Sequence, residues 1–209
     1  MNLLKCMGLA LAVALFAVPA ARAADSDPAV RKIESFYASL VESMKRGPSI
    51  GMQGRYRAME PAVDQTFDIP TMVKFIVGSD WATMSDADHK AIIDAFRRMT
   101  IANYASNFDS FHGEQFTVDP TVQTKAGDTF VQSDLTLKGN AKPIPLMYRM
   151  REIGGDWKAI DVYLNGYVSE LATRRSDFAA TLASGGAPAL IRKLNSLADK
   201  QLAGKSSGG

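Results

Sequence analysis

Cysteine and histidine are scarce in this chain, which contains one cysteine, Cys6, and two histidines, His89 and His112. Cys6 lies in an N-terminal segment that we expect to be removed, so the remaining chain would have no disulfide, thiol nucleophile or thiolate metal site. Two histidines so far apart do not form a metal site by themselves. We interpret His89 as a solvated surface residue and His112 as a cation that complements a helix dipole. We expect neither a metal nor another cofactor.

Common catalytic motifs are also lacking. The chain contains no Gly-x-Ser-x-Gly, no His-Glu-x-x-His, no glycine-rich phosphate loop ahead of a helix and no calcium-binding loop. An excess of positive charge is missing as well. The 24 basic residues face 22 acidic ones, and removal of Lys5 and Arg22 with the N-terminal segment would leave 22 of each sign. A nucleic-acid partner would require clustered basic charge, so we expect none.

The first 23 residues have the pattern of a secretory signal peptide. Lys5 precedes an apolar run over residues 6–18, and the small-x-small sequence Ala21-Arg22-Ala23 comes before a polar stretch. We therefore expect Sec-type export to the periplasm with cleavage near Ala23, a single domain over residues 24–203 and a disordered tail at residues 204–209. The apolar run is too short to span a membrane, and no other run approaches about 18 apolar residues.

Hydrophobic spacing predicts helices in the first half of this domain. Apolar residues recur every three or four positions in several segments, and Pro28, Asp68 and Ser85 are typical helix-start residues. The predicted helices cover residues 28–44, with a stop at Gly47-Pro48, then 70–77 and about 86–108. Between the first two, a looser segment leads from Gly51 and Gly54 into helix-spaced apolar residues, from Tyr56 to Phe67.

The hydrophobic period changes from 3.6 to 2 after Glu114, which predicts strands. The first begins at Phe116, Pro120 marks an edge or a bulge, and Gly154-Gly155 indicates a tight hairpin turn. Further strands are predicted at residues 129–138, 144–153 and 157–164, followed by helices at about 170–183 and 188–202. Helices before and after an antiparallel meander indicate an α+β fold. If the sheet curls, the apolar faces of the helices can leave an apolar cavity against it.

Methionine and aromatic residues are comparatively abundant. Eight of the ten methionines follow the predicted cleavage site, and 16 of the 18 Phe, Tyr and Trp residues fall between Phe36 and Tyr167. Methionine is unbranched and polarizable, so it suits a pocket that adapts to flexible apolar guests. The alternative interpretation is that these residues only pack the core.

Asp161 is the acidic residue of greatest interest. Strand alternation places it on the face shared with Trp157, Ala159 and Tyr163. Inside a cavity its pKa could rise, and it could act as a general base. The alternative is a structural carboxylate that accepts a hydrogen bond from neighbouring backbone or pairs with an arginine.

Arginines occur in local pairs at residues 97–98, 149/151 and 174–175. Arg149 or Arg174 could be the partner of Asp161. Each pair is interpreted as a solvated face or an ion pair. One pair at the mouth of a cavity could instead meet an anionic head group.

Several short segments of the chain are familiar in their order and spacing, namely residues 155–162, Gly166 to Ser169, Arg174 to Phe178, Gly185-Gly186, Phe67-Asp68, Met72, Gly78-x-x-Trp81, Phe96 and Tyr104. Together they resemble the MlaC-like (toluene-tolerance) family of periplasmic lipid-binding proteins, over roughly Pro28 to Leu197. Within that family, the extra residue Tyr167 after Gly166 and the stretch 170–178 look like the hopanoid-biosynthesis-associated HpnM subgroup.

The resemblance implies a curved antiparallel sheet of four or five strands wrapped by helices around an apolar cavity, a shape similar to that of nuclear transport factor 2. It implies a soluble shuttle and not an enzyme. Such a shuttle, expected to be a monomer, would carry a phospholipid or a hopanoid between an inner-membrane transporter complex and an outer-membrane lipoprotein complex.

Apolar residues that point inward from helices and sheet are the candidates for contact with a lipid, and Tyr104 or Tyr148 could also meet a polar group. The candidate set is Met72, Phe75, Ile76, Phe96, Met99, Tyr104, Val131, Leu135, Leu146, Tyr148, Val162 and Val168.

Two other functions stay open on the sequence. An isomerase or dehydratase acting on a polycyclic lipid could use Asp161 as base in the cavity, with Tyr148 or Tyr163 as hydrogen-bond donor. An adaptor without cargo would have a filled interior.

Overall fold

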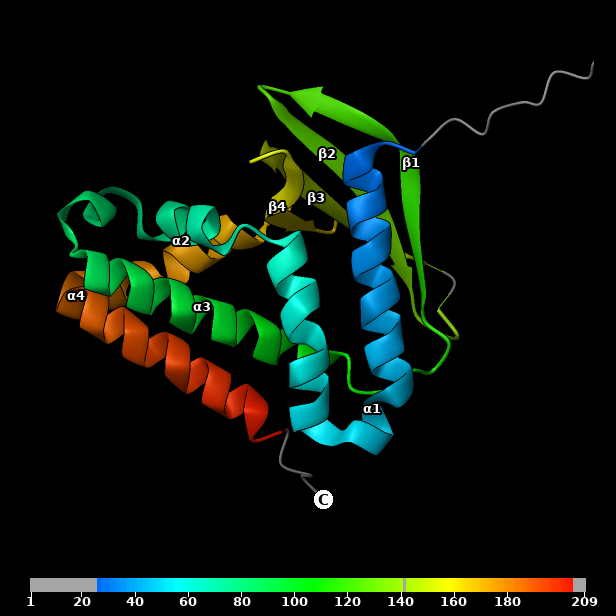
Figure 1. Ribbon diagram of the computed structural model, residues 1–209, viewed down its shortest axis with the longest axis horizontal. Coiled ribbons are helices and arrows are strands. Elements are labelled where there is room, and N and C mark those ends of the chain that lie inside the picture. The colour runs from blue at the N-terminus through cyan, green and yellow to red at the C-terminus, as the bar shows by residue number, and fades with distance from the viewer. Residues whose placement is uncertain (1–25, 141, 205–209) are drawn as a thin grey trace, which may run out of the picture.

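The computed structural model describes residues 26–140 and 142–204, so the predicted signal peptide and all but Gly204 of the predicted tail lie outside the described residues. Within them, helices flank a five-stranded antiparallel sheet, which confirms the predicted α+β class. The first helix covers one face of the sheet, and the remaining helices form a layer that extends past the sheet at one side (Figure 1).

Helix α1 (Pro28–Thr66) begins where predicted, with the Asp27 carboxylate accepting a hydrogen bond from the Ala29 N–H at 2.8 Å. The predicted stop at Gly47-Pro48 is wrong. The helix continues to Gly51, where a positive φ of 62° breaks it into two arms that run side by side (Figure 1). A proline removes only one helical hydrogen bond, whereas a left-handed residue reverses the chain, and glycine adopts that conformation at little cost.

Helix α2 (Ile69–Val77), the 3₁₀ helix η1 (Gly78–Thr83) and helix α3 (Asp86–Asn107) follow. The predicted caps are confirmed: the Asp68 carboxylate accepts from the Thr71 N–H at 3.5 Å, and the Ser85 hydroxyl accepts from the Asp88 N–H at 3.1 Å. Both caps satisfy groups that a helix start leaves unpaired.

The sheet is a meander in the order β1-β2-β3-β4-β5 with every neighbouring pair antiparallel. Four of its strands were predicted, and the predicted glycine hairpin lies between β3 and β4. The strands are β1 (Gln115–Lys125), β2 (Asp128–Thr136), β3 (Ile144–Ile153), β4 (Asp156–Leu164) and the short β5 (Val168–Ser169).

A bulge in β4 corrects the predicted strand faces. Arg149 pairs with Asp161 and Met150 pairs with Ala159, so Ile160 is an extra residue in β4. Beyond a bulge the alternation of side chains restarts by one position. Asp161 therefore does not share a face with Ala159, as simple alternation predicts. It lies on the face of Arg149, opposite the core face of the sheet.

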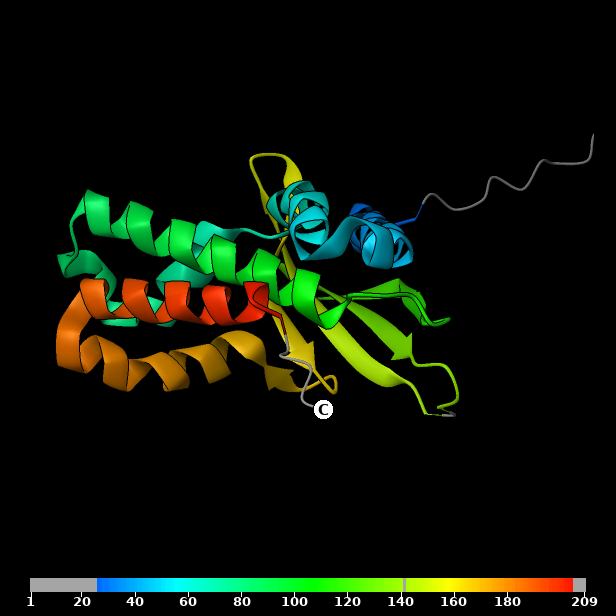
Figure 2. The same cartoon turned by 90° about the horizontal axis from the view of Figure 1, so that it is seen from below.

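Helix α4 (Glu170–Leu202) completes the chain and is broken at Gly185 and Gly186, as predicted. Its two arms fold back on one another, and the second lies beside α3 (Figure 2). Among the helices of the described residues, none combines the length and the apolar character that a bilayer span requires.

Candidate functional site

A cavity of about 520 Å³ lies between α3, α4 and the core face of β3 and β4. Its walls come from segments far apart in the sequence, so it exists only in the folded chain. The lining residues are Phe67, Met72, Phe96, Met99, Thr100, Asn103, Tyr104, Asn107, Phe108, Leu146, Val162, Leu164, Glu170, Leu171, Arg174, Leu197 and Gln201.

Helix α3 supplies one continuous wall. The lining positions run from Phe96 to Phe108, the C-cap of the helix. Each lies three or four positions from another along the chain, a spacing that places them on a single helical face. The wall is apolar at Phe96 and Met99 and becomes polar at Asn103 and Asn107.

Twelve of the lining residues form two parts that differ in burial and polarity, and the other five are half-buried or exposed apolar and aromatic side chains, namely Tyr104, Phe108, Leu146, Leu164 and Leu197. We call the buried part the apolar floor, and the part made of polar, half-buried or exposed side chains the polar rim. The apolar floor consists of Phe67, Met72, Phe96, Met99, Val162 and Leu171. The polar rim consists of Thr100, Asn103, Asn107, Glu170, Arg174 and Gln201.

Tyr104 joins the cavity to the aromatic core. The centroid of its ring lies 5.1 Å from the ring centroid of Phe36, 5.9 Å from that of Phe67 and 6.0 Å from that of Phe108. Its hydroxyl forms no hydrogen bond with the described residues. Burial raises the pKa of Tyr104, and the negative charge of Glu170 contributes in the same direction. The phenol therefore stays protonated at neutral pH and can donate a hydrogen bond to a guest.

The polar rim is internally bonded. The Asn107 amide donates to the Asn103 amide oxygen at 2.9 Å, and the Thr100 hydroxyl donates to the Phe96 carbonyl at 2.9 Å. Arg174 lies 3.6 Å from Glu170, one helical turn away on α4. These two are the charged side chains of the lining, so its formal charge is balanced.

Half of the residues predicted to contact a lipid line this cavity, and the others do not. Those in the lining are Met72, Phe96, Met99, Tyr104, Leu146 and Val162. Four are buried elsewhere in the core, namely Ile76, Val131, Leu135 and Tyr148. Phe75 and Val168 are 43% and 39% exposed, and Phe75 lies beneath the Arg175 guanidinium.

Sequence reasoning missed the polar rim of the cavity, except that Arg174 was considered as part of an arginine pair. An apolar candidate set omits Asn103 and Asn107 by definition. A signal was present nonetheless, because both asparagines continue the helical stripe that starts at Phe96 and Met99. Gln201 comes from the far end of α4, and no local pattern indicated its position.

Asp161 is a structural carboxylate outside the cavity lining. Its Oδ1 accepts hydrogen bonds from the Val162 N–H at 2.8 Å and the Leu171 N–H at 3.2 Å, and its Oδ2 accepts from the Ser169 hydroxyl at 2.6 Å. Backbone hydrogen bonding was one of the two alternatives drawn from the sequence. The arginine partners considered for Asp161 are occupied elsewhere, because Arg149 binds Asp128 and Arg174 lies beside Glu170.

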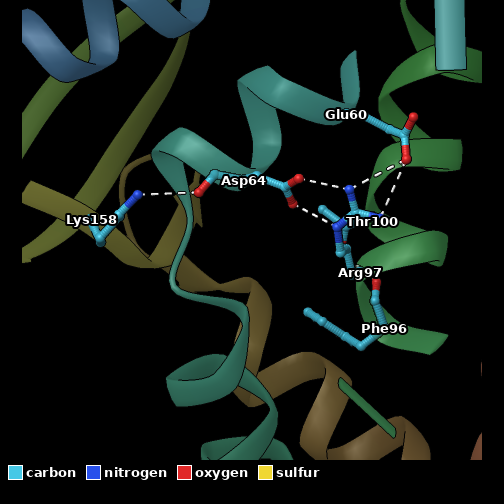
Figure 3. Close-up of polar contacts among 6 residues, drawn as sticks. All are labelled: Glu60, Asp64, Phe96, Arg97, Thr100 and Lys158. Atoms are coloured by element: carbon cyan, nitrogen blue, oxygen red, sulfur yellow. Dashed lines mark hydrogen bonds and ion pairs between the residues drawn. The ribbon is translucent and has the colours of Figure 1, made fainter. Parts of the chain in front are cut away.

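Arg97 connects the polar face of α3 to the second arm of α1 through ion pairs. Its guanidinium binds Asp64 at 2.6 and 2.7 Å and approaches Glu60 at 3.3 Å (Figure 3). Lys158 of β4 donates to the carbonyl oxygen of Asp64 at 3.1 Å, so three elements meet there. The neighbouring residues Phe96 and Thr100 line the cavity, and the contact therefore positions its wall.

The two histidines have different surroundings. His89 is not the solvated residue that we predicted: its ring stacks on Trp81 at 3.8 Å, and its Nε2 lies 2.8 Å from the Trp81 carbonyl oxygen. His112 is exposed and bonds the Ser110 hydroxyl at 2.8 Å. Within residues 26–140 and 142–204, no group of three or more potential metal ligands is present.

A family model described as MlaC protein matches residues 34–196. The chain belongs to the MlaC family. The predicted family is thereby confirmed, and the match includes most of α1, the whole sheet and all but the last turns of α4.

A solved structure extends the comparison to three dimensions. The chain is similar to a phospholipid-binding protein from Ralstonia solanacearum, determined in complex with a phospholipid, with a TM-score of 0.73 and 18% sequence identity. The similarity covers 84% of this chain and 99% of that chain. At this identity the likeness establishes a shared fold. No protein of curated function matches the sequence.

Proposed function

We propose that this chain is a periplasmic lipid-binding protein that shuttles one lipid between membranes and catalyses no reaction. The observation that carries the proposal is the cavity, whose apolar floor is buried while its polar rim is partly open to water. Membership of the MlaC family supports it, and so does the shared fold with a protein that binds a phospholipid.

The chemistry of the cavity suits acyl chains. Each methylene transferred from water to an apolar site stabilises binding by about 0.8 kcal/mol. Met72 and Met99 supply unbranched, polarizable contacts that follow a flexible chain, and Phe96 and Val162 supply fixed ones. The volume of about 520 Å³ falls within the range of known small-molecule sites.

The polar rim supports a phospholipid as the proposed cargo. The charged head group of a phospholipid could interact with Glu170 and Arg174 at the polar rim. A purely hydrocarbon hopanoid has no charged group that could pair with either side chain. We therefore favour a phospholipid. A hopanoid, the cargo associated with the resembling HpnM subgroup, is the second candidate because the apolar floor would also accept a rigid polycycle.

The proposal also covers the cellular location of the protein and the complexes with which it exchanges lipid. Export follows from the signal peptide pattern of residues 1–23, with residues 24–203 as the working domain. We further propose that the carrier is a monomer and docks on an inner-membrane transporter complex and an outer-membrane lipoprotein complex, a proposal that membership of the MlaC family supports.

The enzyme alternative loses its base, because the carboxylate of Asp161 is engaged by three hydrogen bonds away from the lining. The adaptor alternative requires a filled interior, which the cavity opposes.

Native mass spectrometry of the protein purified from the periplasm without detergent tests this function. We expect one lipid per chain, identified by solvent extraction as a phospholipid; an extracted hopanoid would replace the favoured cargo with the second. A bare chain that also takes up no lipid from added vesicles would overturn the proposal.

A further inference from the structure

The start of α4 places opposite charges side by side at the edge of the cavity. Glu170 and Arg174 are one turn apart, with a carboxylate oxygen and a guanidinium nitrogen separated by 3.6 Å. Each side chain is 31% exposed, so both can reach a guest from a partly desolvated position. Burial is the main cause of the raised pKa of Tyr104 in the cavity wall, and the negative charge of Glu170 contributes in the same direction.

The backbone of α4 offers little to an anion at this point. The Leu171 N–H donates to Asp161, and the Ala172 N–H donates to the Ser169 hydroxyl at 3.0 Å. A helix start with free N–H groups attracts phosphate, but these two donors in its first turn are already used. Recognition of a negative group therefore falls to the side chain of Arg174.

From this arrangement we propose that the rim selects a zwitterionic phospholipid head group of the phosphoethanolamine type, with the phosphate at Arg174 and the ammonium at Glu170. The inference rests on the proposed lipid-binding function. Both charges of such a head group meet an opposite charge. The glycerol head group of an anionic phospholipid leaves Glu170 without a cation, because Arg174 then pairs with the phosphate.

The asparagines on the opposite wall complete the subsite. Asn103 and Asn107 bond to each other through one amide contact, which leaves the Asn103 amide protons and the Asn107 amide oxygen for other partners. Tyr104, on the same face of α3, contributes a hydroxyl that has no hydrogen-bond partner in the described part of the chain. These neutral groups can bind the ester and phosphate oxygens of a head group without altering the charge balance.

A competition experiment tests the selectivity. Delipidated protein is incubated with vesicles of equimolar dioleoyl phosphatidylethanolamine and phosphatidylglycerol, separated from them, and its lipid is quantified by mass spectrometry. We expect the wild type to load phosphatidylethanolamine in about fivefold preference, which corresponds to the roughly 1 kcal/mol of a partly exposed ion pair. Glu170→Gln should bring the ratio close to one, and Arg174→Gln should reduce loading of both lipids.

Matched variants separate the subsite from general surface charge. Glu42→Gln and Arg192→Gln alter exposed residues outside the lining and should keep the wild-type ratio and yield. Equal loading by the wild type, or an unchanged ratio in Glu170→Gln, overturns the head-group inference while lipid binding stands. A wild type that loads neither lipid overturns the proposed function itself.

Discussion

Asp161 and Ser169 form a short hydrogen bond, 2.6 Å between carboxylate and hydroxyl oxygens, that ties β4 to the start of α4. The same carboxylate accepts from the Leu171 N–H, and Leu171 belongs to the apolar floor of the cavity. Asp161 therefore positions the helix that carries the rim charges, without contacting the cavity itself.

Removal of this carboxylate should affect stability first. We expect Asp161→Ala to lower the free energy of unfolding by about 1–3 kcal/mol, the cost of unpaired buried donors. Asp161→Asn should cost less, because its amide oxygen can still accept from backbone N–H groups. Urea unfolding of both variants measures the effect. An Asp161→Asn protein that keeps its stability but no longer converts a bound polycyclic lipid would favour the enzyme alternative.

A charge introduced into the cavity should abolish lipid retention. Leu146 lines the cavity and is half-buried, so an aspartate there would place a carboxylate against acyl chains. We expect Leu146→Asp to reduce lipid per chain at least about tenfold, because an unpaired charge in an apolar site costs several kcal/mol. The measurement is lipid extraction from purified, folded protein.

Val168 provides the control for Leu146. It was a predicted contact, but it is 39% exposed and absent from the lining. Val168→Asp should therefore retain lipid at the wild-type level. Loss of lipid in this variant would return Val168 to the binding site, and normal lipid content in Leu146→Asp would remove Leu146 from it.

Asp128 should make stability depend on acid pH. Its carboxylate is 1% exposed, and hydrogen bonds from Arg151 and Arg149 hold its pKa below the ordinary value. Because the folded pKa is lower than the unfolded value of about 3.9, the stabilisation is complete above about pH 5 and is lost as the pH falls through the folded pKa.

Replacement of that carboxylate tests the assignment. Asp128→Asn should lower the free energy of unfolding by about 1–3 kcal/mol at pH 7 and flatten its decline below about pH 4. Asp94→Asn, at an exposed pair with Lys90, should change stability by less than about 0.5 kcal/mol. Equal losses in the two variants would contradict a special role for Asp128.

Two buried serines should respond in opposite directions to alanine. The Ser133 hydroxyl lies 2.7 Å from the Tyr37 hydroxyl, whereas the buried Ser43 hydroxyl has no hydrogen-bond partner within residues 26–140 and 142–204. We expect Ser133→Ala to destabilise by about 1 kcal/mol and Ser43→Ala to be neutral or stabilising, since it removes an unpaired polar atom. Thermal unfolding of both variants decides. A clear loss of stability in Ser43→Ala would mean that its hydroxyl has a partner.

The sequence by itself determined the kinds of element and their order. Three local patterns carried this information: the helical spacing, the change to period 2 after Glu114 and the break at Gly185-Gly186. Each depends on residues that are close in the sequence, so it can be recognised without knowledge of the tertiary structure. The same reasoning failed at Pro48, because a proline weakens a helix but only the left-handed Gly51 reverses it.

Only the tertiary structure decided which inward-facing residues meet a cavity. Val131 and Val162 both lie in predicted strands and share one face of the sheet. Val131 is fully buried in the core, whereas Val162 lines the cavity beside α4. The bulge at Ile160 moved Asp161 away from that face, and packing of α4 on α3 brought Glu170 and Arg174 to the edge of the cavity. Periodicity distinguishes inside from outside, but a cavity depends on how separate elements fill space together.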